Sequence, residues 1–232
     1  MNDKPMVFVV DGDAITRDSA RSLAHTMNLQ CETYASGREF LENRTRGQPG
    51  CLVLEIRIPD VNGLQIQDRL NREGSMLPII FLTDHATVSI AVHAMRCGAL
   101  HVIEKPFREH ELWDAIQEAV ELDRKRRRLA EERRALEHRM TQLSAKEQTL
   151  LKMIAQGRAK QAMAAELGVC VRTVEFRRSQ LMKKLELRAP IDLVQFALAA
   201  SDGHSWRDHD HGRAVSLSPL QWHGERYGQY SR

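Results

Sequence analysis

The sequence CLVLEIRIPDVNG, at residues 51–63, contains the clearest indication of how this chain folds. Its first four residues are apolar, which is typical of a short buried strand bounded by turn-forming residues. Glu55 stands at the end of that strand, and the chain then enters a loop marked by Pro59 and Gly63. Because ligands of open α/β sheets bind outside the carboxyl ends of the strands, the carboxylate of Glu55 is a candidate functional group.

Other short apolar runs lie on either side of this strand, at residues 6–10, 30–34, 79–82 and 101–103. Amphipathic helical patterns separate and follow the runs, at residues 14–27, 37–44, 63–72, 89–94 and 109–120. Short strands that alternate with helices are typical of a parallel sheet covered on both faces. Residues 1–120 therefore predict an α/β domain with a doubly wound, five-stranded parallel sheet.

Residues 121–142 lack Gly and Pro and consist mostly of good helix formers, so they predict a long helical linker. Leu122, Leu129, Leu136 and Leu143 recur every seven residues. A coiled coil needs apolar residues at two positions of each heptad, and only one such position is regular here. The stripe fits either a parallel dimeric contact or a solvated spacer helix.

A small all-α domain is expected at residues 143–200, with helices at 144–155, 160–167, 172–185 and 191–200. Ser144 and Glu147 form the pattern of a capping box, and Gly157 and Gly168 follow the first two helices as C-terminal glycines do. Residues 201–232 show no periodicity and are rich in polar residues and glycine. We expect this tail to be disordered.

The charges are ordered along the chain rather than mixed. Residues 1–120 carry 12 Lys and Arg against 17 Asp and Glu, whereas residues 121–140 carry 8 against 5 and residues 141–200 carry 10 against 5. An acidic first half followed by a basic second half is typical of a regulatory module joined to a nucleic-acid-binding module.

The remaining compositional features concern compartment and metals. The scattered cysteines lack the spacing of a zinc site, and we expect buried thiols in a reducing compartment. The apolar run at residues 6–10 ends at once in Asp11, so we expect neither a signal peptide nor a membrane span and place the chain in the cytoplasm. Histidines and aspartates recur in the tail, as at His204, His209 and His211. They fit a metal site or a polar, linker-like segment, and we favour the second.

Two sets of residues resemble known modules. Asp11, Glu55, Thr83 and Lys105-Pro106 each stand at the end of a strand, and the first half thereby resembles the receiver domain of two-component response regulators, which has a flavodoxin-like fold. The motifs LSAKE (143–147), KQAMAAEL (160–167) and RTVE (172–175) resemble the LuxR-type helix-turn-helix domain. Together they are similar to the FixJ/NarL family over residues 1–200.

The resemblance implies a site for phosphoryl transfer. In such receivers a histidine kinase phosphorylates an aspartate, two acids hold Mg²⁺, a Thr or Ser contacts the phosphoryl oxygens, and a Lys neutralises their charge. Thr83 and Lys105 match the last two roles, and Asp11 matches the first acid of the pair.

Three positions depart from the family pattern. Glu55 replaces the aspartate, Gly12 replaces the second acid, and Val102 replaces the usual aromatic switch residue. Asp13 lies one residue further along and is expected to point elsewhere, so we expect neither ordinary phosphorylation nor Mg²⁺ binding, and no other cofactor. Glutamate reaches about one C–C bond further than aspartate, towards Lys105. This pair either holds the domain in a fixed, partly active-like state or is a structural ion pair in an inactive pocket.

The same resemblance implies a DNA-reading helix at residues 172–185. A carboxylate beside DNA phosphates is unfavourable, so Glu175 among basic neighbours predicts contact with a cytosine amino group. Phosphate contacts are assigned to Lys160, Arg178, Lys183 and Lys184. The other candidates at this interface are Arg172, Thr173, Phe176, Arg177 and Ser179. The alternative is an ordinary amphipathic surface helix whose basic residues are solvated.

The last helical segment is more apolar than one face of a small domain requires. Leu193, Val194 and Phe196 are candidates for the dimer contact that the family makes there, and core packing is the alternative.

We therefore expect a DNA-binding transcriptional regulator with an atypical receiver, which acts on double-stranded DNA as a homodimer. A histidine kinase or another regulator is a further expected partner. The rivals are a conventionally phosphorylated regulator and a protein-interaction module that binds DNA weakly. An enzyme is not expected, because no nucleophile and base stand at a recognisable spacing.

Overall fold

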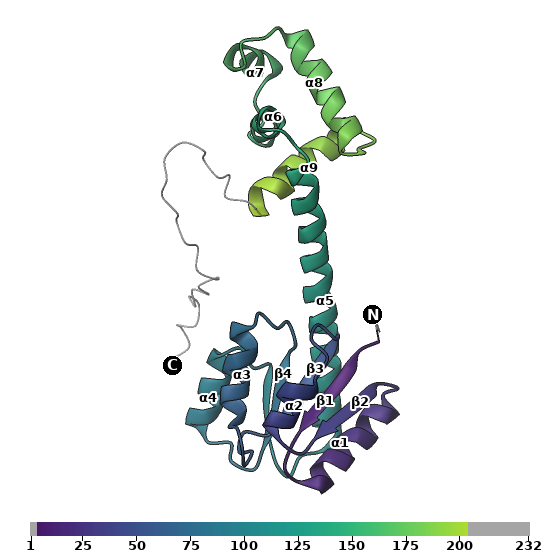
Figure 1. Cartoon of the computed structure of the whole chain (residues 1–232), viewed down its shortest axis with the longest axis vertical. Coiled ribbons are helices and arrows are strands. Elements are labelled where there is room, and N and C mark those ends of the chain that lie inside the picture. The colour runs from purple at the N-terminus through teal and green to yellow at the C-terminus, as the bar shows by residue number, and fades with distance from the viewer. Residues whose placement is uncertain (1–3, 204–232) are drawn as a thin grey trace, which may run out of the picture. The chain divides into compact units, whose positions relative to one another are not determined.

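The computed structural model describes residues 4–203, and Figure 1 labels most of its helices and strands. The tail from His204 onward, with its expected disorder and histidine cluster, lies outside the described residues. The chain divides into two compact units between Ala135 and Leu136. Within residues 4–203, no helix is both long and apolar enough to cross a membrane.

The first unit is a parallel sheet covered by helices. Its strands are β1 (Met6–Val10), β2 (Gln30–Tyr34), β3 (Gly50–Leu54), β4 (Ile79–Thr83) and β5 (His101–Glu104). Its helices are α1 (Ala14–Thr26), α2 (Gly37–Asn43), α3 (Gly63–Arg72), α4 (Val88–Arg96) and the greater part of α5 (Glu109–Thr141). The strand order is β2-β1-β3-β4-β5, and every neighbouring pair is parallel. The predicted fold class is confirmed.

Alternate residues of β3 belong to two different cores, one on each face of the sheet, because successive side chains of a strand point to opposite faces. Leu52 and Leu54 belong to the core beneath α2, α3 and α4. Cys51 and Val53 belong to the core beneath α1 and α5. Since the whole strand is buried, a functional side chain reaches the surface only beyond its end.

The loop that follows β3 depends on a close backbone approach at Gly63. The Gly63 N–H donates a hydrogen bond of 2.8 Å to the Ile56 carbonyl oxygen. A Cβ atom at Gly63 would lie 2.4 Å from the carbonyl oxygen of Glu55, so a side chain does not fit. This contact fixes the start of α3 against the strand end and thereby positions Glu55.

Helix α5 runs well beyond the predicted segment at residues 109–120 and continues through the predicted linker. The leucine stripe is not uniform along it. Leu129 is 55% exposed, whereas Leu143, just after the helix, is buried in the core of the second unit. Leu136 packs against that same core. The last turn of α5 is therefore part of the second unit rather than a spacer.

The second unit is all-α, as predicted, with α6 (Ala145–Ala155), α7 (Lys160–Glu166), α8 (Val171–Lys184) and α9 (Pro190–Gly203). The capping box is present: the Ser144 N–H donates to Glu147 Oε2 at 2.7 Å, and the Glu147 N–H donates to Ser144 Oγ at 3.4 Å. Gly157 and Gly168 have φ values of 66° and 62°, as C-terminal glycines do. Helix α9 extends past Ala200, so the predicted tail begins too early.

The expectation that the cysteines are buried holds fully for Cys51 alone. Cys31 and Cys97 are partly buried, and Cys170 is exposed. The reason is position: Cys31 lies on the edge strand β2, Cys97 caps the end of α4, and Cys170 precedes α8. All are free thiols.

Candidate functional site

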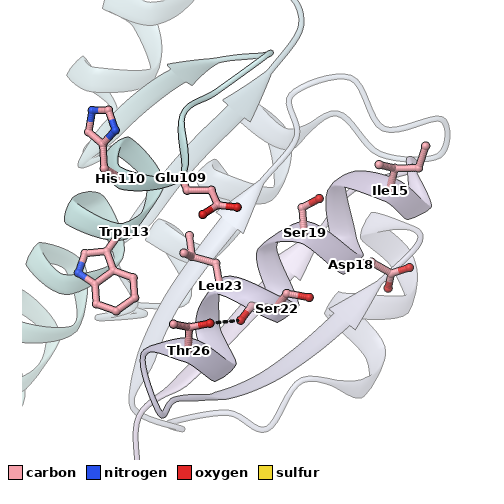
Figure 2. Close-up of a pocket in the computed structure, with 9 residues that line it drawn as sticks. All are labelled: Ile15, Asp18, Ser19, Ser22, Leu23, Thr26, Glu109, His110 and Trp113. Atoms are coloured by element: carbon pink, nitrogen blue, oxygen red, sulfur yellow. Dashed lines mark hydrogen bonds between the residues drawn. The ribbon is translucent and has the colours of Figure 1, made fainter.

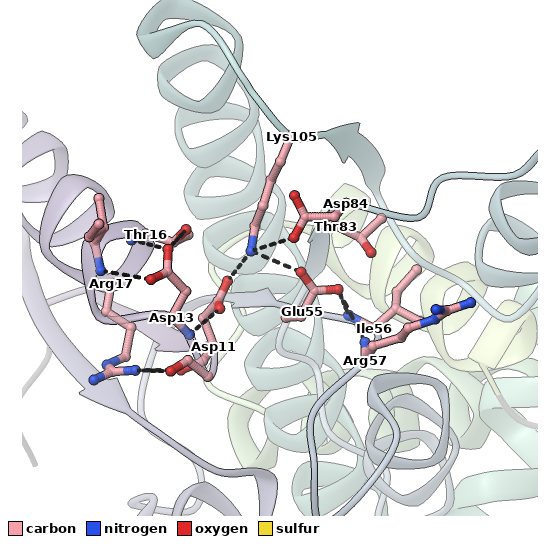
Figure 3. A network of polar contacts seen from close by, with 12 residues as sticks. Asp11, Asp13, Thr16, Arg17, Glu55, Ile56, Arg57, Thr83, Asp84 and Lys105 are labelled. Carbon is pink, nitrogen blue, oxygen red and sulfur yellow. Dashed lines mark hydrogen bonds and ion pairs between the residues drawn. The ribbon is translucent and has the colours of Figure 1, made fainter.

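The structure brings Asp11, Glu55, Thr83 and Lys105 together at one edge of the sheet (Figure 3). Asp11 follows β1, Glu55 follows β3, Thr83 ends β4 and Lys105 follows β5. Because these strands are parallel neighbours, their carboxyl ends form one crevice. The arrangement is a pocket of charged groups with little access to solvent.

Lys105 lies between two buried carboxylates. Its Nζ donates to Asp11 Oδ2 at 2.6 Å and lies 2.9 Å from Glu55 Oε2. The side chains of Lys105, Asp11 and Glu55 are 9, 4 and 6% exposed, so solvent screens their attraction only weakly. Asp84, which sequence reasoning missed, adds a carboxylate 3.8 Å from Lys105 at the exposed rim.

The other oxygen of Glu55 is held by the main chain. Glu55 Oε1 accepts hydrogen bonds from the N–H groups of Ile56 at 2.7 Å and Arg57 at 3.1 Å. The carboxylate thus turns back onto its own loop while it faces Lys105 (Figure 3). The donors that a bound anion would need here are already engaged: the ammonium by a hydrogen bond to Asp11 and an ion pair with Glu55, and the two amides by Glu55.

These contacts set the charge states in the pocket. Burial alone would raise the pKa of Glu55, but interactions with Thr83 and Lys105 outweigh it and hold that pKa below its usual value. Burial dominates at Asp11 and raises its pKa. Burial would lower the pKa of Lys105, but the two carboxylates outweigh it and raise that pKa. The pocket therefore favours the charged form of Glu55 and disfavours the charged form of Asp11, each relative to the same carboxyl group in water.

Neither of the two residues after Asp11 supplies the second acid of a metal-binding pair. Gly12 has no side-chain ligand, and a Cβ added there would meet only Pro59 Cδ, at 3.8 Å. Asp13 is the N-cap of α1, where its carboxylate accepts from the N–H and hydroxyl of Thr16 at 3.0 and 2.8 Å. The Asp13 carboxylate is therefore committed to the helix.

Sequence reasoning also missed Arg17. Its Nη1 donates to the carbonyl oxygens of Asp11 at 2.8 Å and Gly12 at 3.0 Å, which fixes the loop after β1. The signal was its position one helical turn after the N-cap residue Asp13. Val102, at the switch position, is partly buried and packs against the core beneath α2, α3 and α4.

A groove of about 800 Å³ lies beside the pocket, between α1 and the start of α5 (Figure 2). Its apolar wall includes Ile15, Leu23 and Trp113, and its acidic groups are Asp18 and Glu109. Ile15 is 77% exposed, which is unusual for a large apolar side chain on a helix. The groove offers a contact surface that the sequence did not predict.

Helix α8 presents one polar face and one buried face. Val174, Leu181 and Leu185 fill the core of the second unit. The exposed face carries Arg172, Glu175, Phe176, Ser179 and Lys183, while Thr173, Arg177 and Arg178 are partly buried. Phe176 is 62% exposed, so its ring does not pack in the core of the second unit.

Lys160 and Glu175, both predicted to contact DNA, contact each other. Lys160 Nζ lies 2.6 Å from Glu175 Oε1, which links α7 to the solvent face of α8. The neighbouring ammonium lowers the pKa of Glu175. Both side chains are about half exposed, so the pair is accessible to a ligand.

Two of the three predicted dimer residues are wrong as surface candidates. Leu193 and Phe196 are buried in the core of their own unit, and Val194 is partly buried. The Arg139 guanidinium lies 4.7 Å from the centre of the Phe196 ring and donates to the Leu185 carbonyl oxygen. The last turn of α5 therefore covers the face of α9 that the sequence alone left open.

A receiver-like sheet with a charged pocket, followed by a helix-turn-helix, defines a class of DNA-binding signalling proteins. Residues 7–117 match the response regulator receiver domain, and residues 141–197 match the bacterial regulatory proteins of the luxR family. The chain belongs to the response regulators that join a receiver domain to a LuxR-type DNA-binding domain. It is a DNA-binding transcriptional regulator and not an enzyme.

Individual relatives extend over most of the chain. Nodulation protein W of Bradyrhizobium diazoefficiens is 37% identical over 204 residues, which cover 87% of this chain and 90% of that protein. Transcriptional regulatory protein FixJ of Azorhizobium caulinodans is 31% identical, with 84% and 92% covered. The solved structure of the response regulator StyR has a TM-score of 0.74 at 36% identity, with 83% and 98% covered.

Proposed function

We propose that this regulator acts in the cytoplasm, binds double-stranded DNA through its second unit, and carries a receiver that works without phosphorylation. The observation that carries the proposal is the double engagement of Glu55, by Lys105 at 2.9 Å and by two main-chain N–H groups. A phosphoryl acceptor must present a free oxygen and leave room for the product beside the cation. Glu55 instead places a permanent negative charge there, which supports a fixed, partly active-like state.

Loss of Mg²⁺ binding is part of the proposal. Mg²⁺ requires a near-octahedral set of well-placed oxygens. Here the Asp11 carboxylate bonds to Lys105, the Asp13 carboxylate caps α1, and Gly12 has no side-chain oxygen. The residues present therefore do not fit a resident Mg²⁺ ion, and no step of the function is assigned to one.

Treatment of the purified protein with acetyl phosphate and Mg²⁺ tests this function. We expect no covalent phosphoryl group on the wild type, measured by intact mass and by phosphate-affinity gels. The Glu55→Gln variant is the control. A phosphoryl group that is present on the wild type and absent from Glu55→Gln would establish the conventionally phosphorylated rival.

We assign DNA reading to the Lys160–Glu175 pair. On docking, Lys160 turns to a phosphate and Glu175 accepts from a cytosine amino group. Selection of bound sites from random DNA should therefore show that Glu175→Ala relaxes the preference at one base pair. The matched control is Glu166→Ala, which removes an exposed acid of α7 and should leave the preference unchanged.

The salt dependence of the same binding separates base reading from phosphate contact. Arg178→Ala should weaken binding to all sites alike and reduce the slope of log K against log salt by about 1. A wild-type curve that is flat in dilute salt would favour the rival protein-interaction module. An unchanged preference in Glu175→Ala would contradict the base-reading role.

We propose that two copies of the chain form a homodimer through the exposed face of α9, and not through its buried residues Leu193 and Phe196. Ile191 and Leu198 are 59% and 46% exposed, and with the partly buried Val194 they follow the i, i+3, i+7 spacing of one helix face. Leu198→Glu should abolish two-copy binding to a double-site DNA, as measured by analytical ultracentrifugation. Ala199→Glu, exposed on the adjacent face, should retain it. Equal stoichiometry in both variants would rule out this stripe.

A protein partner, either a histidine kinase or another regulator, is assigned to the first unit. The groove beside α1 supports this assignment because it combines exposed Ile15 with the acidic side chains of Asp18 and Glu109. Such a contact does not require Glu55 to accept a phosphoryl group.

A further inference from the structure

A second polar cavity lies at the opposite edge of the sheet, where β3 and β4 begin. Its volume is about 220 Å³, and its walls are the loop before β3, the loop before β4 and helix α5. The charged residues in its lining are Arg44, Arg46, Arg127, Arg134 and a single acid, Glu73. All of them belong to the first unit. The function proposed above makes no use of this cavity.

Arg44 is the buried cation of the group. Its side chain is only 8% exposed, pairs with Glu73 and lies 5.8 Å from the centre of the Phe40 ring. Its Nε is buried and has no hydrogen-bond partner among the described residues. A buried charged donor without an acceptor is costly, and it indicates an acceptor that the described residues do not supply.

Of the other three arginines in the lining, one is engaged by neighbouring residues, and two leave positive charge at the cavity. Arg127 is engaged: it bonds to Asp123 at 2.7 Å and to the carbonyl oxygens of Gly47 and Gln48 at 2.7 and 3.0 Å. Arg46 is 75% exposed and reaches Glu73 only at 3.9 Å. Arg134 is exposed on α5.

Glu73 cannot neutralise this group. Its carboxylate is shared by Arg44 and by Arg69, which bonds to it at 3.1 Å from outside the cavity. The lining therefore keeps an excess of guanidinium groups around a space that is small and polar. An anion with several acceptor oxygens would satisfy them together.

We propose that this cavity binds a phosphate-bearing anion, held by Arg44, Arg46 and Arg134. Guanidinium groups suit phosphate because each presents two parallel N–H donors to two oxygens. The volume suits a phosphoryl group better than an entire nucleotide, which would extend past the exposed Arg46 and Arg134. The anion would bridge the loop before β3 to α5 and add to the contacts of Arg127.

Hydrogen exchange on the full-length protein tests the site. Inorganic phosphate, added at constant ionic strength, should slow exchange in a saturable manner at residues 44–48 and 73–77. In the Arg46→Gln/Arg134→Gln variant the apparent affinity should fall at least about tenfold, because two charge-assisted contacts are lost. Arg124→Gln/Arg128→Gln removes two exposed arginines of α5 outside the cavity and should leave the affinity unchanged.

A parallel titration with ADP distinguishes the source of the phosphoryl group. Tighter binding of ADP than of inorganic phosphate assigns the site to a nucleotide, and equal or weaker binding assigns it to free phosphate. The proposal is overturned by absence of protection at both loops, by equal affinity in the two double variants, or by protection confined to the basic helix α8. None of these outcomes depends on whether Glu55 accepts a phosphoryl group.

Discussion

The Gly12→Asp/Glu55→Asp variant is expected to take up a phosphoryl group from acetyl phosphate in the presence of Mg²⁺, whereas the wild type takes up none. The backbone at Gly12 has room for the new side chain, since its Cβ would meet only Pro59 Cδ at 3.8 Å. Shortening Glu55 withdraws its carboxylate from Lys105 by about 1.5 Å, one C–C bond. Thr83 and Lys105 are already in place, so the two substitutions restore the missing acceptor and metal ligand together.

Intact mass in the presence and absence of Mg²⁺ measures this gain. Gly12→Asp/Glu55→Asn, which has the metal ligand but no acceptor, is the matched control and should remain unmodified. Each single variant should gain far less than the pair, because acceptor and metal act as one unit. No uptake by the double variant, in a protein that folds normally, would contradict the view that these two positions alone withhold the chemistry.

Lys105→Met is expected to lower the free energy of unfolding of the first unit by about 3–5 kcal/mol at neutral pH. The substitution leaves the buried carboxylates of Asp11 and Glu55 facing each other without their cation. Urea unfolding, followed by a signal from the first unit, measures the loss. Lys125→Met removes an exposed lysine of α5 and should change the stability by less than about 0.5 kcal/mol.

The loss of stability in Lys105→Met should depend on pH and be smaller in acid than at neutral pH. In the wild type the pKa of Glu55 is lowered, so its contribution is present above the usual value of 4.5 and is lost as the pH falls through the folded pKa. The raised pKa of Asp11 acts in the opposite sense and costs stability above that pKa. Without Lys105 both carboxyl pKa values rise, and the folded variant binds more protons than the unfolded chain.

The difference in the free energy of unfolding between wild type and Lys105→Met should therefore become smaller as the pH falls through the raised carboxyl pKa values of the variant. Glu55→Gln/Lys105→Met supplies an internal check. It should be less destabilised than Lys105→Met at neutral pH, because one unpaired charge has been removed. If the difference in unfolding free energy between wild type and Lys105→Met is constant across the acid range, the loss of stability comes from lost packing of the lysine side chain and not from charge.

The sheet and its pocket were predictable because their signals are local. Each strand is a short apolar run, and parallel strands bring their carboxyl ends to one edge. Asp11, Glu55 and Lys105 could thus be placed together from three separated positions in the sequence. The Asp13 carboxylate was expected only to point away from the pocket, and the structure supplies the reason, since Asp13 is the N-cap of α1.

The exposed face of α9 was not predictable in the same way. The apolar residues of α9 do not say which of its faces is covered, because the cover comes from α5, far away in the sequence. Arg139 lies over the Phe196 ring, and Met140 is buried in the same core. The arginine cavity has the same origin, since Arg44 and Arg134 are brought together only by the tertiary fold.

Helix α5 continues without a break through residue 120, where the end of the first domain was predicted, because the sequence contains no helix-stopping residue there. The structure distinguishes its parts by burial instead. Asp123 is buried and accepts from the Gly50 N–H at 2.9 Å, whereas Met140 is buried in the second core. Helical propensity is alike in both parts, so propensity alone does not reveal the change of partner.

The interval at residues 128–135 of α5 belongs to neither core. Apart from the partly buried Ala130, its side chains are exposed, and among the described residues Arg128 pairs only with Glu132 of the same helix, at 2.9 Å. A helix this short is marginal by itself in water, because nucleation is unfavourable. Its order therefore depends on the anchored turns before and after it. Local melting of either anchor would spread into this interval, so its amide protection reports on the integrity of both domains at once.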